Sequence, residues 1–255
     1  MAPRGLKKIL KTSVSAKLVG KGKFKCFQPL RAGTPNGRKL RGLTKALEST
    51  IWSSGTLPTV AKYGKVARSG WRGKGGGRRR GIAVDSQLSR AVNAGKSRPQ
   101  KGQYTLVKIA LAMLADNGLE PVACQRAVCS ERARLGTAID ILAYEKLTSR
   151  LVVVELKCGC SGAKTAAATK NGRPCTMSAP LGATPDTMLN RHLTQLACTR
   201  ALFVREQAAM AKMQAIGIES YVGGALLYVN DEESELYTLS PWWISRSSRL
   251  LDALG

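Results

Sequence analysis

Residues 137–157, TAIDILAYEKLTSRLVVVELK, give the strongest indication of the fold in the whole sequence. Ala138 to Tyr144 is rich in residues that favour strands, residues 145–150 are polar, and residues 151–156 form an apolar, Val-rich run. The stretch therefore predicts two β-strands joined by a tight connection. We expect the two strands to pair as an antiparallel hairpin at the centre of the sheet.

Charged side chains lie at matching ends of this predicted hairpin. Asp140 is in the first strand, and Glu155 and Lys157 end the second. Because side chains alternate between the faces of a strand, Glu155 and Lys157 point the same way, and hairpin pairing brings Asp140 to them. Carboxylates that converge repel each other unless a cation neutralises them, and Mg²⁺ or Mn²⁺ prefers oxygen ligands. The stretch predicts a divalent metal site with Asp140 and Glu155 as ligands.

The order of these residues resembles the PD-(D/E)XK nuclease superfamily. The match consists of Asp140 and of Glu155, Leu156 and Lys157 in an apolar strand. Gly136, four residues before Asp140, is similar to the strand entry of the RecB-like, viral-type exonuclease branch. The alternative interpretation is a solvated strand end, since Glu-x-Lys also occurs by chance.

Two predicted helices extend the resemblance. Gly81 and Asp85 open a predicted helix over residues 81–93, and they resemble an acidic element of the family's first helix. Gln195 matches the Gln of a later helix, although Thr199 stands where the family pattern has Tyr. An acid at a helix start and a Gln on a helix surface, neither with a role in chemistry, are the alternatives.

The resemblance covers roughly residues 81–230 and implies an α/β fold. It implies a restriction-endonuclease-like core, a central mixed β-sheet flanked by helices, with a basic N-terminal extension. It also implies Mg²⁺-dependent hydrolysis of DNA phosphodiester bonds, often by an exonuclease in recombination, replication or repair, and often in viruses. Lys157 would lie near the attacking water, and Gln195 would support the phosphate. The implied catalytic residues are Asp85, Asp140, Glu155, Lys157 and Gln195.

The charge of the chain points to a polyanionic partner. The net charge is +25, and residues 1–84 contain 21 Lys and Arg but one acid, Glu48. Nucleic acid, most plainly DNA, is the expected partner, because phosphate contacts release counterions. An anionic membrane is the weaker alternative, because there is no run of 18 apolar residues and no clear amphipathic helix with an aromatic face.

The uneven charge predicts a division of the chain. Residues 1–80 are expected to form a basic, Gly-rich, partly flexible nucleic-acid-binding extension, and residues 81–255 the nuclease-like domain. The glycines at 75–77 argue against a helix there, and no Lys-Ser/Thr ending makes this run a phosphate loop. The residues expected to contact nucleic acid are Trp71, Arg72, Lys74, Arg78, Arg79 and Arg80.

The remaining pattern supplies the other elements of the sheet and its cover. A strand is expected at 121–129, with further strands at 221–228 and 236–239. Helices are expected at 104–117, 188–213 and 244–254, and a long loop at 158–185. This is the order of helices and strands that a PD-(D/E)XK core would have.

Cysteine usage favours an intracellular protein. The seven cysteines are an odd number and no secretory signal is visible, so a reduced interior is expected. The basic N-terminus makes the nucleus or mitochondrion of a host cell the expected compartment, and the resemblance implies a virus-encoded protein as the alternative. Residues 1–19 fit a transit peptide, a nuclear targeting tail or a nucleic-acid-binding arm equally well. Cys158 and Cys160 follow Lys157 directly, but free thiols are favoured over an iron–sulfur cluster because no second pair is visible.

A second class of function fits the same charge. A non-catalytic, basic nucleic-acid-binding or structural protein on a nuclease-like scaffold would need the basic residues but no metal. Loss of Mg²⁺-dependent DNA cleavage on replacing Lys157 or Glu155 separates the two.

Overall fold

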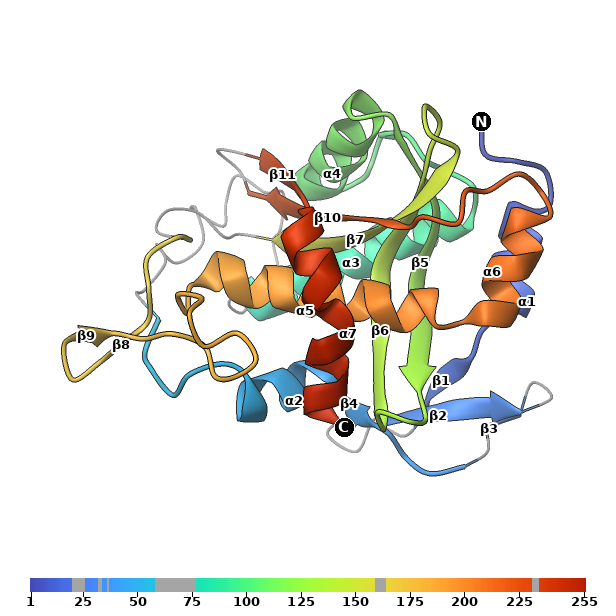
Figure 1. Ribbon diagram of the computed structural model, residues 1–255. Coiled ribbons are helices and arrows are strands. Elements are labelled where there is room, and N and C mark those ends of the chain that lie inside the picture. The colour runs from blue at the N-terminus through green and yellow to red at the C-terminus, as the bar shows by residue number, and fades with distance from the viewer. Residues whose placement is uncertain (20–25, 32–33, 36, 58–76, 159–163, 231–233) are drawn as a thin grey trace.

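Figure 1 shows the computed structural model of the protein. It describes residues 1–19, 26–31, 34–35, 37–57, 77–158, 164–230 and 234–255. The helices are α1 (Leu6–Thr12), α2 (Leu43–Thr50), α3 (Gly77–Asn93), α4 (Thr105–Asp116), α5 (Met188–Val204), α6 (Gln207–Gln214) and α7 (Pro241–Leu254). The strands are β1 (Ala16–Val19), β2 (Cys26–Arg31), β3 (Thr34–Pro35), β4 (Arg41–Gly42), β5 (Leu119–Ser130), β6 (Leu135–Glu145), β7 (Arg150–Cys158), β8 (Thr169–Lys170), β9 (Arg173–Pro174), β10 (Gly223–Val229) and β11 (Ser234–Thr238).

A mixed sheet forms the centre of the fold, as the resemblance implied, and it has six strands. Its order is β11-β10-β7-β6-β4, with β5 also paired to β6. The predicted hairpin is confirmed, since β6 and β7 pair antiparallel. β10 runs parallel to β7, and β4 runs parallel to β6. The sheet therefore combines local hairpins with two longer connections, which is how residues far apart in sequence reach one edge.

Helices cover both faces of this sheet (Figure 1). Alternate residues of β7 separate into two clusters: Leu151 and Val153 pack with α5 and α7, and Val152 and Val154 pack with α3 and α4. This alternation is the period of two that a strand imposes on its side chains. A β7 buried on both faces explains the unbroken Val run in the sequence.

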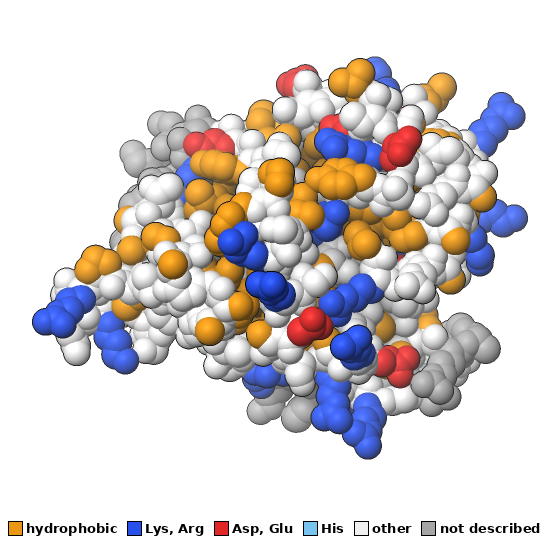
Figure 2. All heavy atoms as spheres, viewed as in Figure 1, with side chains coloured by type: hydrophobic (Ala, Val, Ile, Leu, Met, Phe, Trp, Pro, Cys, Tyr) orange, Lys and Arg blue, Asp and Glu red, His pale blue; other side chains and the backbone are white. Residues whose placement is uncertain are grey.

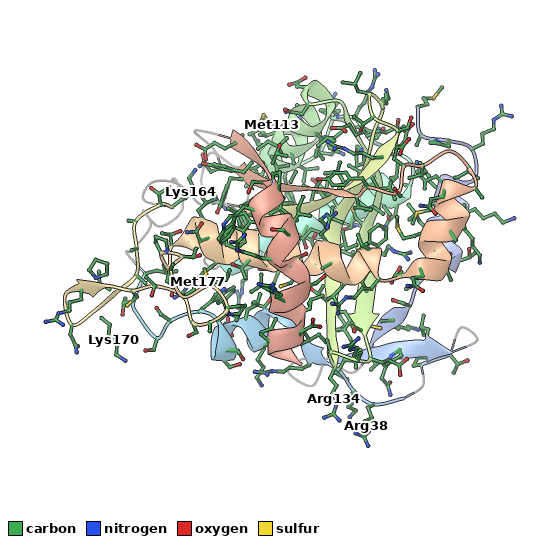
Figure 3. The ribbon with its side chains drawn as sticks, in the orientation of Figure 1. Arg38, Met113, Arg134, Lys164, Lys170 and Met177 are labelled. Atoms are coloured by element: carbon green, nitrogen blue, oxygen red, sulfur yellow. The ribbon has the colours of Figure 1, made fainter. Side chains whose placement is uncertain are left out.

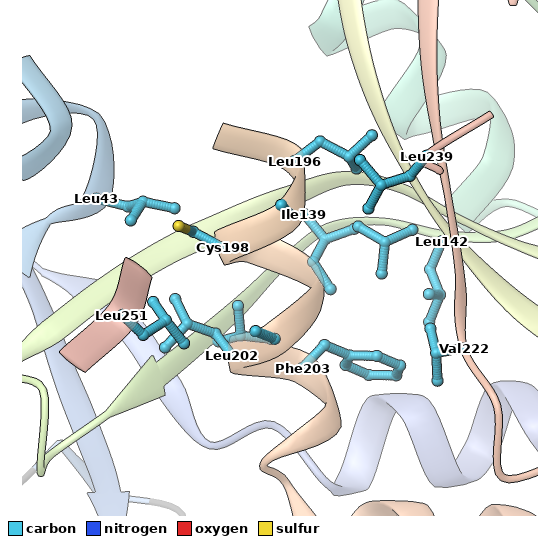
Figure 4. Packing of buried hydrophobic residues seen from close by; sticks show 14 of the residues in the cluster. Leu43, Ile139, Leu142, Leu196, Cys198, Leu202, Phe203, Val222, Leu239 and Leu251 are labelled. Atoms are coloured by element: carbon cyan, nitrogen blue, oxygen red, sulfur yellow. The ribbon is translucent and has the colours of Figure 1, made fainter. Parts of the chain in front are cut away.

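The N-terminal residues belong to the main core. Figure 4 shows Leu43 of α2 beside Cys198 of α5, with Leu251 of α7 also in the cluster. Leu6 and Leu10 of α1 are buried in the same cluster. Fully burying a Leu contributes roughly 1.5–3 kcal/mol. The described residues before 58 thus contribute buried side chains to the main core. The predicted division at residue 80 falls inside α3.

The helix expected from Gly81 begins four residues earlier, at Gly77. The expectation that the glycines would prevent helix here was wrong for Gly77. Val84, Leu88 and Val92 of α3 are buried against α4, and this tertiary packing outweighs the weak propensity of two glycines. Gly81 therefore lies within α3, and Asp85 lies two turns inside the helix.

Two further segments differ from expectation. The single helix expected at 188–213 is broken into α5 and α6 at Arg205 and Glu206, and the Glu206 side chain accepts hydrogen bonds from Ser15 and from Arg126 of β5. The loop expected at 158–185 contains the β8–β9 hairpin, which projects from the body of the molecule (Figure 1). Its turn is Asn171-Gly172, both with positive φ, as a tight hairpin turn requires.

In the described part of the chain, none of the helices is both long and apolar enough to cross a bilayer.

Candidate active site

The candidate site lies where β6 and β7 separate. The two strands pair from Glu145 opposite Arg150 to Ile141 opposite Val154, and there the ladder stops. Beyond this point β6 stays beside β5, whereas β7 stays beside β10. At the fork the Leu156 N–H donates to Asp140 Oδ2 (3.0 Å). The Asp140 carboxylate thus takes the place of a backbone partner and is fixed between the strands.

Glu155, Lys157 and Gln195 form a closed set of contacts. Lys157 Nζ donates to Glu155 Oε1 (2.6 Å) and to Gln195 Oε1 (3.2 Å). Gln195 Nε2 donates to the same Glu155 oxygen (2.6 Å). Glu155 and Lys157 share a face of β7 because they are two residues apart, and α5 packs over that face. The three residues predicted from sequence therefore meet in one place.

Gln125 joins the other two predicted acids. Its Nε2 donates to Asp85 Oδ1 (2.8 Å) and lies 3.3 Å from Asp140 Oδ1. Gln125 has a φ of 53°, a backbone conformation that is uncommon outside Gly. Asp85 comes from α3, Asp140 from β6 and Gln125 from β5. Three elements thus bring their polar side chains to the strand fork.

The carboxyl groups at the fork hold protons more tightly than isolated ones. Burial, followed by the charge of Asp140, raises the pKa of Glu155 to about 7. Burial and the same charge raise the pKa of Asp85 to about 6. The pKa of Asp140 is also raised, by burial, against the opposing effect of Lys157. Groups that repel each other and resist ionisation are a common feature of catalytic sites.

The oxygens at the fork suit a hard divalent cation. The charge of Asp140 raises the pKa of Glu155, which indicates that the two carboxyl groups lie close enough to interact. Mg²⁺ usually uses one or two protein carboxylates and keeps several waters. Within the described ranges no group of three or more His, Cys, Asp or Glu is arranged to hold an ion. The pair therefore fits Mg²⁺ as two ligands, with Asp85 held beside it through Gln125.

A small cavity opens beside the carboxylates. It has a volume of about 150 Å³, and Asp85, Asp140 and Lys157 contribute to its lining. A cavity of this size can hold water molecules or a small group such as a phosphate. The acids, the lysine and a space for a reacting group therefore coincide.

His192, for which the sequence predicted no role, lies next to this set. Its Nδ1 is 2.8 Å from the Tyr228 hydroxyl, and Tyr228 is opposite Lys157 in the β7–β10 pair. Burial, and then the charges of Lys157 and Arg191, lower the pKa of His192 well below its ordinary value. His192 is therefore neutral at pH 7 and adds no charge near Lys157.

The residues expected to contact nucleic acid divide into three groups. Trp71, Arg72 and Lys74 lie outside the described residues, and the side chain of Arg78 is also not described. Arg79 is exposed on α3, whereas Arg80 is only 1% exposed. Of these two arginines of α3, Arg79 is therefore the one that is accessible to nucleic acid, since Arg80 is buried.

Basic side chains are more abundant than acids on the face seen in Figure 2. Figure 3 places Lys170 at the tip of the β8–β9 hairpin and Arg38 and Arg134 at the lower edge of the molecule. All three residues are exposed. These cations surround the core from several elements, so the positive charge is not confined to one segment.

Gln125 is the functional candidate that the sequence did not reveal. It lies in β5 between the Cys124–Ile141 and Arg126–Ile139 pairs of the β5–β6 ladder, which brings it to the level of Asp140. The proximity of Gln125 to Asp140 follows only from the register of β5 and β6, and no sequence motif indicates it. Cys26, Cys124, Cys129, Cys175 and Cys198 have free thiols, and Cys160 lies outside the described residues.

A comparison with protein-family models finds no match to the chain, and a comparison with curated proteins finds none either. The geometry of the strand fork is therefore the basis on which a function is inferred.

Proposed function

We propose that the protein is a Mg²⁺-dependent nuclease that hydrolyses phosphodiester bonds of DNA, acting as an exonuclease in recombination, replication or repair. The observation that carries the proposal is the meeting of Asp140, Glu155, Lys157 and Gln195 at the fork between β6 and β7. The core would then be of the restriction-endonuclease-like type. The mixed sheet with helices on both faces is compatible with this type.

The divalent ion would be held by Asp140 and Glu155, and it would supply Lewis acidity and charge neutralisation at the scissile phosphate. Lys157 would orient the attacking water and stabilise negative charge that develops on the phosphate. Its 2.6 Å contact with Glu155 keeps the ammonium group at the site. Because Lys157 lines the small cavity, its ammonium group can take both of these roles.

Gln195 and Asp85 have supporting roles in this proposal. Gln195 contacts both Glu155 and Lys157, so it holds these two side chains in place relative to each other. Its amide also offers a donor to a phosphate oxygen. Asp85 adds negative charge that attracts the cation, and Gln125 holds it near Asp140.

The test is cleavage of end-labelled DNA by purified protein with Mg²⁺ and with EDTA. We expect Lys157→Ala and Glu155→Ala each to reduce the rate by about 100-fold or more, since general acid–base and electrostatic groups contribute this much. Both variants should keep salt-sensitive DNA binding, because the exposed basic residues are unchanged.

Lys146→Ala and Glu219→Ala are matched controls. They remove one exposed charge of each sign outside the described site contacts, and they should cleave like the wild type. Equal cleavage by the wild type and all four variants would indicate a contaminating nuclease and would remove the support for the proposal.

The second candidate is a non-catalytic nucleic-acid-binding protein on this scaffold. The observation that favours it is the net charge of +25, which favours a polyanionic partner and needs no catalytic residues. Tight, salt-sensitive binding without Mg²⁺-dependent cleavage in the same assay would favour this candidate.

A further inference from the structure

A larger cleft lies on the other side of Gln125. Its volume is about 640 Å³, against about 150 Å³ beside the carboxylates. α1, β1 and a segment of β5 from Val122 to Ala127 form most of its lining. In Figure 1 these elements lie together at one side of the sheet. The cleft is therefore a distinct feature with its own walls.

The charged residues described in the lining are all basic. Lys7, Lys11 and Lys17 are exposed side chains at the cleft, and Lys7 and Lys11 are one turn apart on the same side of α1. Arg126 is the fourth, and it is buried in contacts with Glu206 and two backbone carbonyls. The three lysines are thus available to anions, and the ligand of this cleft should carry negative charge at intervals.

The rest of the lining is largely apolar. Val14, Leu18 and Phe27 contribute to it, and Leu18 is 45% exposed. Proteins that bind single-stranded nucleic acid combine a basic groove with aromatic and apolar side chains against which bases stack. A free phosphate or an acidic peptide would use the lysines but leave this apolar surface uncovered.

Gln125 connects the cleft with the carboxylates. It is exposed in the cleft lining, yet its amide contacts both Asp85 and Asp140. A chain lying in the cleft would therefore meet the carboxylate site at Gln125. Gln125 lines the cleft, whereas its two partners, Asp85 and Asp140, are not among the residues that line it.

We propose that this cleft binds a single strand of nucleic acid and leads it past Gln125 to the carboxylates at the strand fork. Cavities of roughly 300–1,000 Å³ enclose ligands of drug size, so the cleft suits a short run of unpaired nucleotides and not a duplex. The inference rests on the proposed nuclease function and adds that the substrate is single-stranded where it enters the site.

The test measures binding in EDTA, so that it is independent of hydrolysis. The probes are a fluorescent oligothymidylate of about 12 nucleotides, within the ~4–16 that single-strand sites cover, and a duplex of equal length. The cleft variant is Lys7→Glu with Lys17→Glu. Its matched control is Lys146→Glu with Lys212→Glu, two exposed lysines outside the cleft lining. Thermal unfolding of each variant verifies that it is folded, and Lys7→Gln with Lys17→Gln gives a milder change.

We expect the cleft variant to bind the oligothymidylate about tenfold more weakly than the control does, with a flatter salt dependence. Its affinity for the duplex should match that of the control. Equal single-strand affinities in the two variants, or no binding of oligothymidylate by the wild type, would overturn the proposal. A parallel loss of duplex affinity would also overturn it, because the cleft would then be part of a duplex surface.

Failure of the nuclease proposal gives a different pattern. Selective loss of single-strand binding without Mg²⁺-dependent cleavage would leave the cleft as a binding site and reject the enzyme. Cleavage that is present, with cleft and control variants binding alike, would reject the cleft alone.

Discussion

Individual residues at the strand fork were predictable because they are close in sequence. Asp140, Glu155 and Lys157 lie on two consecutive strands, so a hairpin was enough to bring them together. Gln195 depended on the resemblance to a known nuclease pattern, and the structure places it against Glu155. Gln125 depended on the register of a third strand, which composition and periodicity do not specify.

His192 gives a pH-dependent prediction at the scale of one residue. Folding lowers its pKa well below 6.5, through burial and the charges of Lys157 and Arg191. Above about pH 6.5 both the folded and the unfolded chain hold a neutral imidazole. Below it the unfolded chain binds a proton that the folded protein excludes, so this residue's contribution to the free energy of unfolding is lost as the pH falls.

The measurement compares urea unfolding of the wild type and His192→Gln from pH 7.5 to pH 5. We expect the stability of the wild type relative to the variant to fall by up to about 1.4 kcal/mol per pH unit below pH 6.5. The raised pKa values of Asp85 and Glu155 act in the opposite direction in both proteins, so the difference isolates His192. A difference that stays constant with pH would contradict the assigned environment.

Elements differed from prediction where distant contacts decide their ends. The α5 helix stops at Val204, and just beyond this end the Glu206 carboxylate pairs with Arg126 of β5 and accepts from Ser15. Arg126 also donates to the backbone carbonyls of Leu10 and Ser13. A helical pattern in the sequence contains no sign of these partners. The same contacts fasten the end of α1 to the sheet.

Glu206→Ala tests whether the contacts of Arg126 and Glu206 hold α1 against the sheet. Arg126 and Glu206 have only 3% and 5% of their side chains exposed, so the variant leaves a buried guanidinium without its counter-charge. Breaking a buried pair in this way costs roughly 3–5 kcal/mol. Denaturant unfolding should show this loss, and protease should cut the N-terminal segment sooner.

Asp252→Ala is the control, because its pair with Arg205 is largely exposed and such pairs contribute about 0–1 kcal/mol. Similar losses in the two variants would show that the Arg126–Glu206 pair does not hold α1 in place.

At the scale of the whole molecule, the composition indicated the class of partner but not the arrangement of the chain. The high charge of residues 1–84 predicted a separate basic extension. Yet α1 and α2 supply buried leucines to the main core, and β4 joins the central sheet. Net charge reports on solubility and partners and is indifferent to packing, so it could not distinguish an appendage from an integrated segment. The mixed sheet with helices on both faces was implied by the resemblance to a nuclease pattern, and hydrophobic periodicity indicated where its strands and helices lie in the sequence.

The proposed function depends on a divalent ion held by Asp140 and Glu155. Its most direct test is a crystal of the wild-type protein soaked with Mn²⁺, with anomalous scattering recorded at the manganese edge and Glu155→Gln treated alike. We predict an anomalous peak within bonding distance of both carboxyl groups in the wild type, roughly 2.0–2.6 Å for such hard cations, and its loss in the variant. A wild-type crystal whose manganese peaks all lie away from these two groups would contradict the claim.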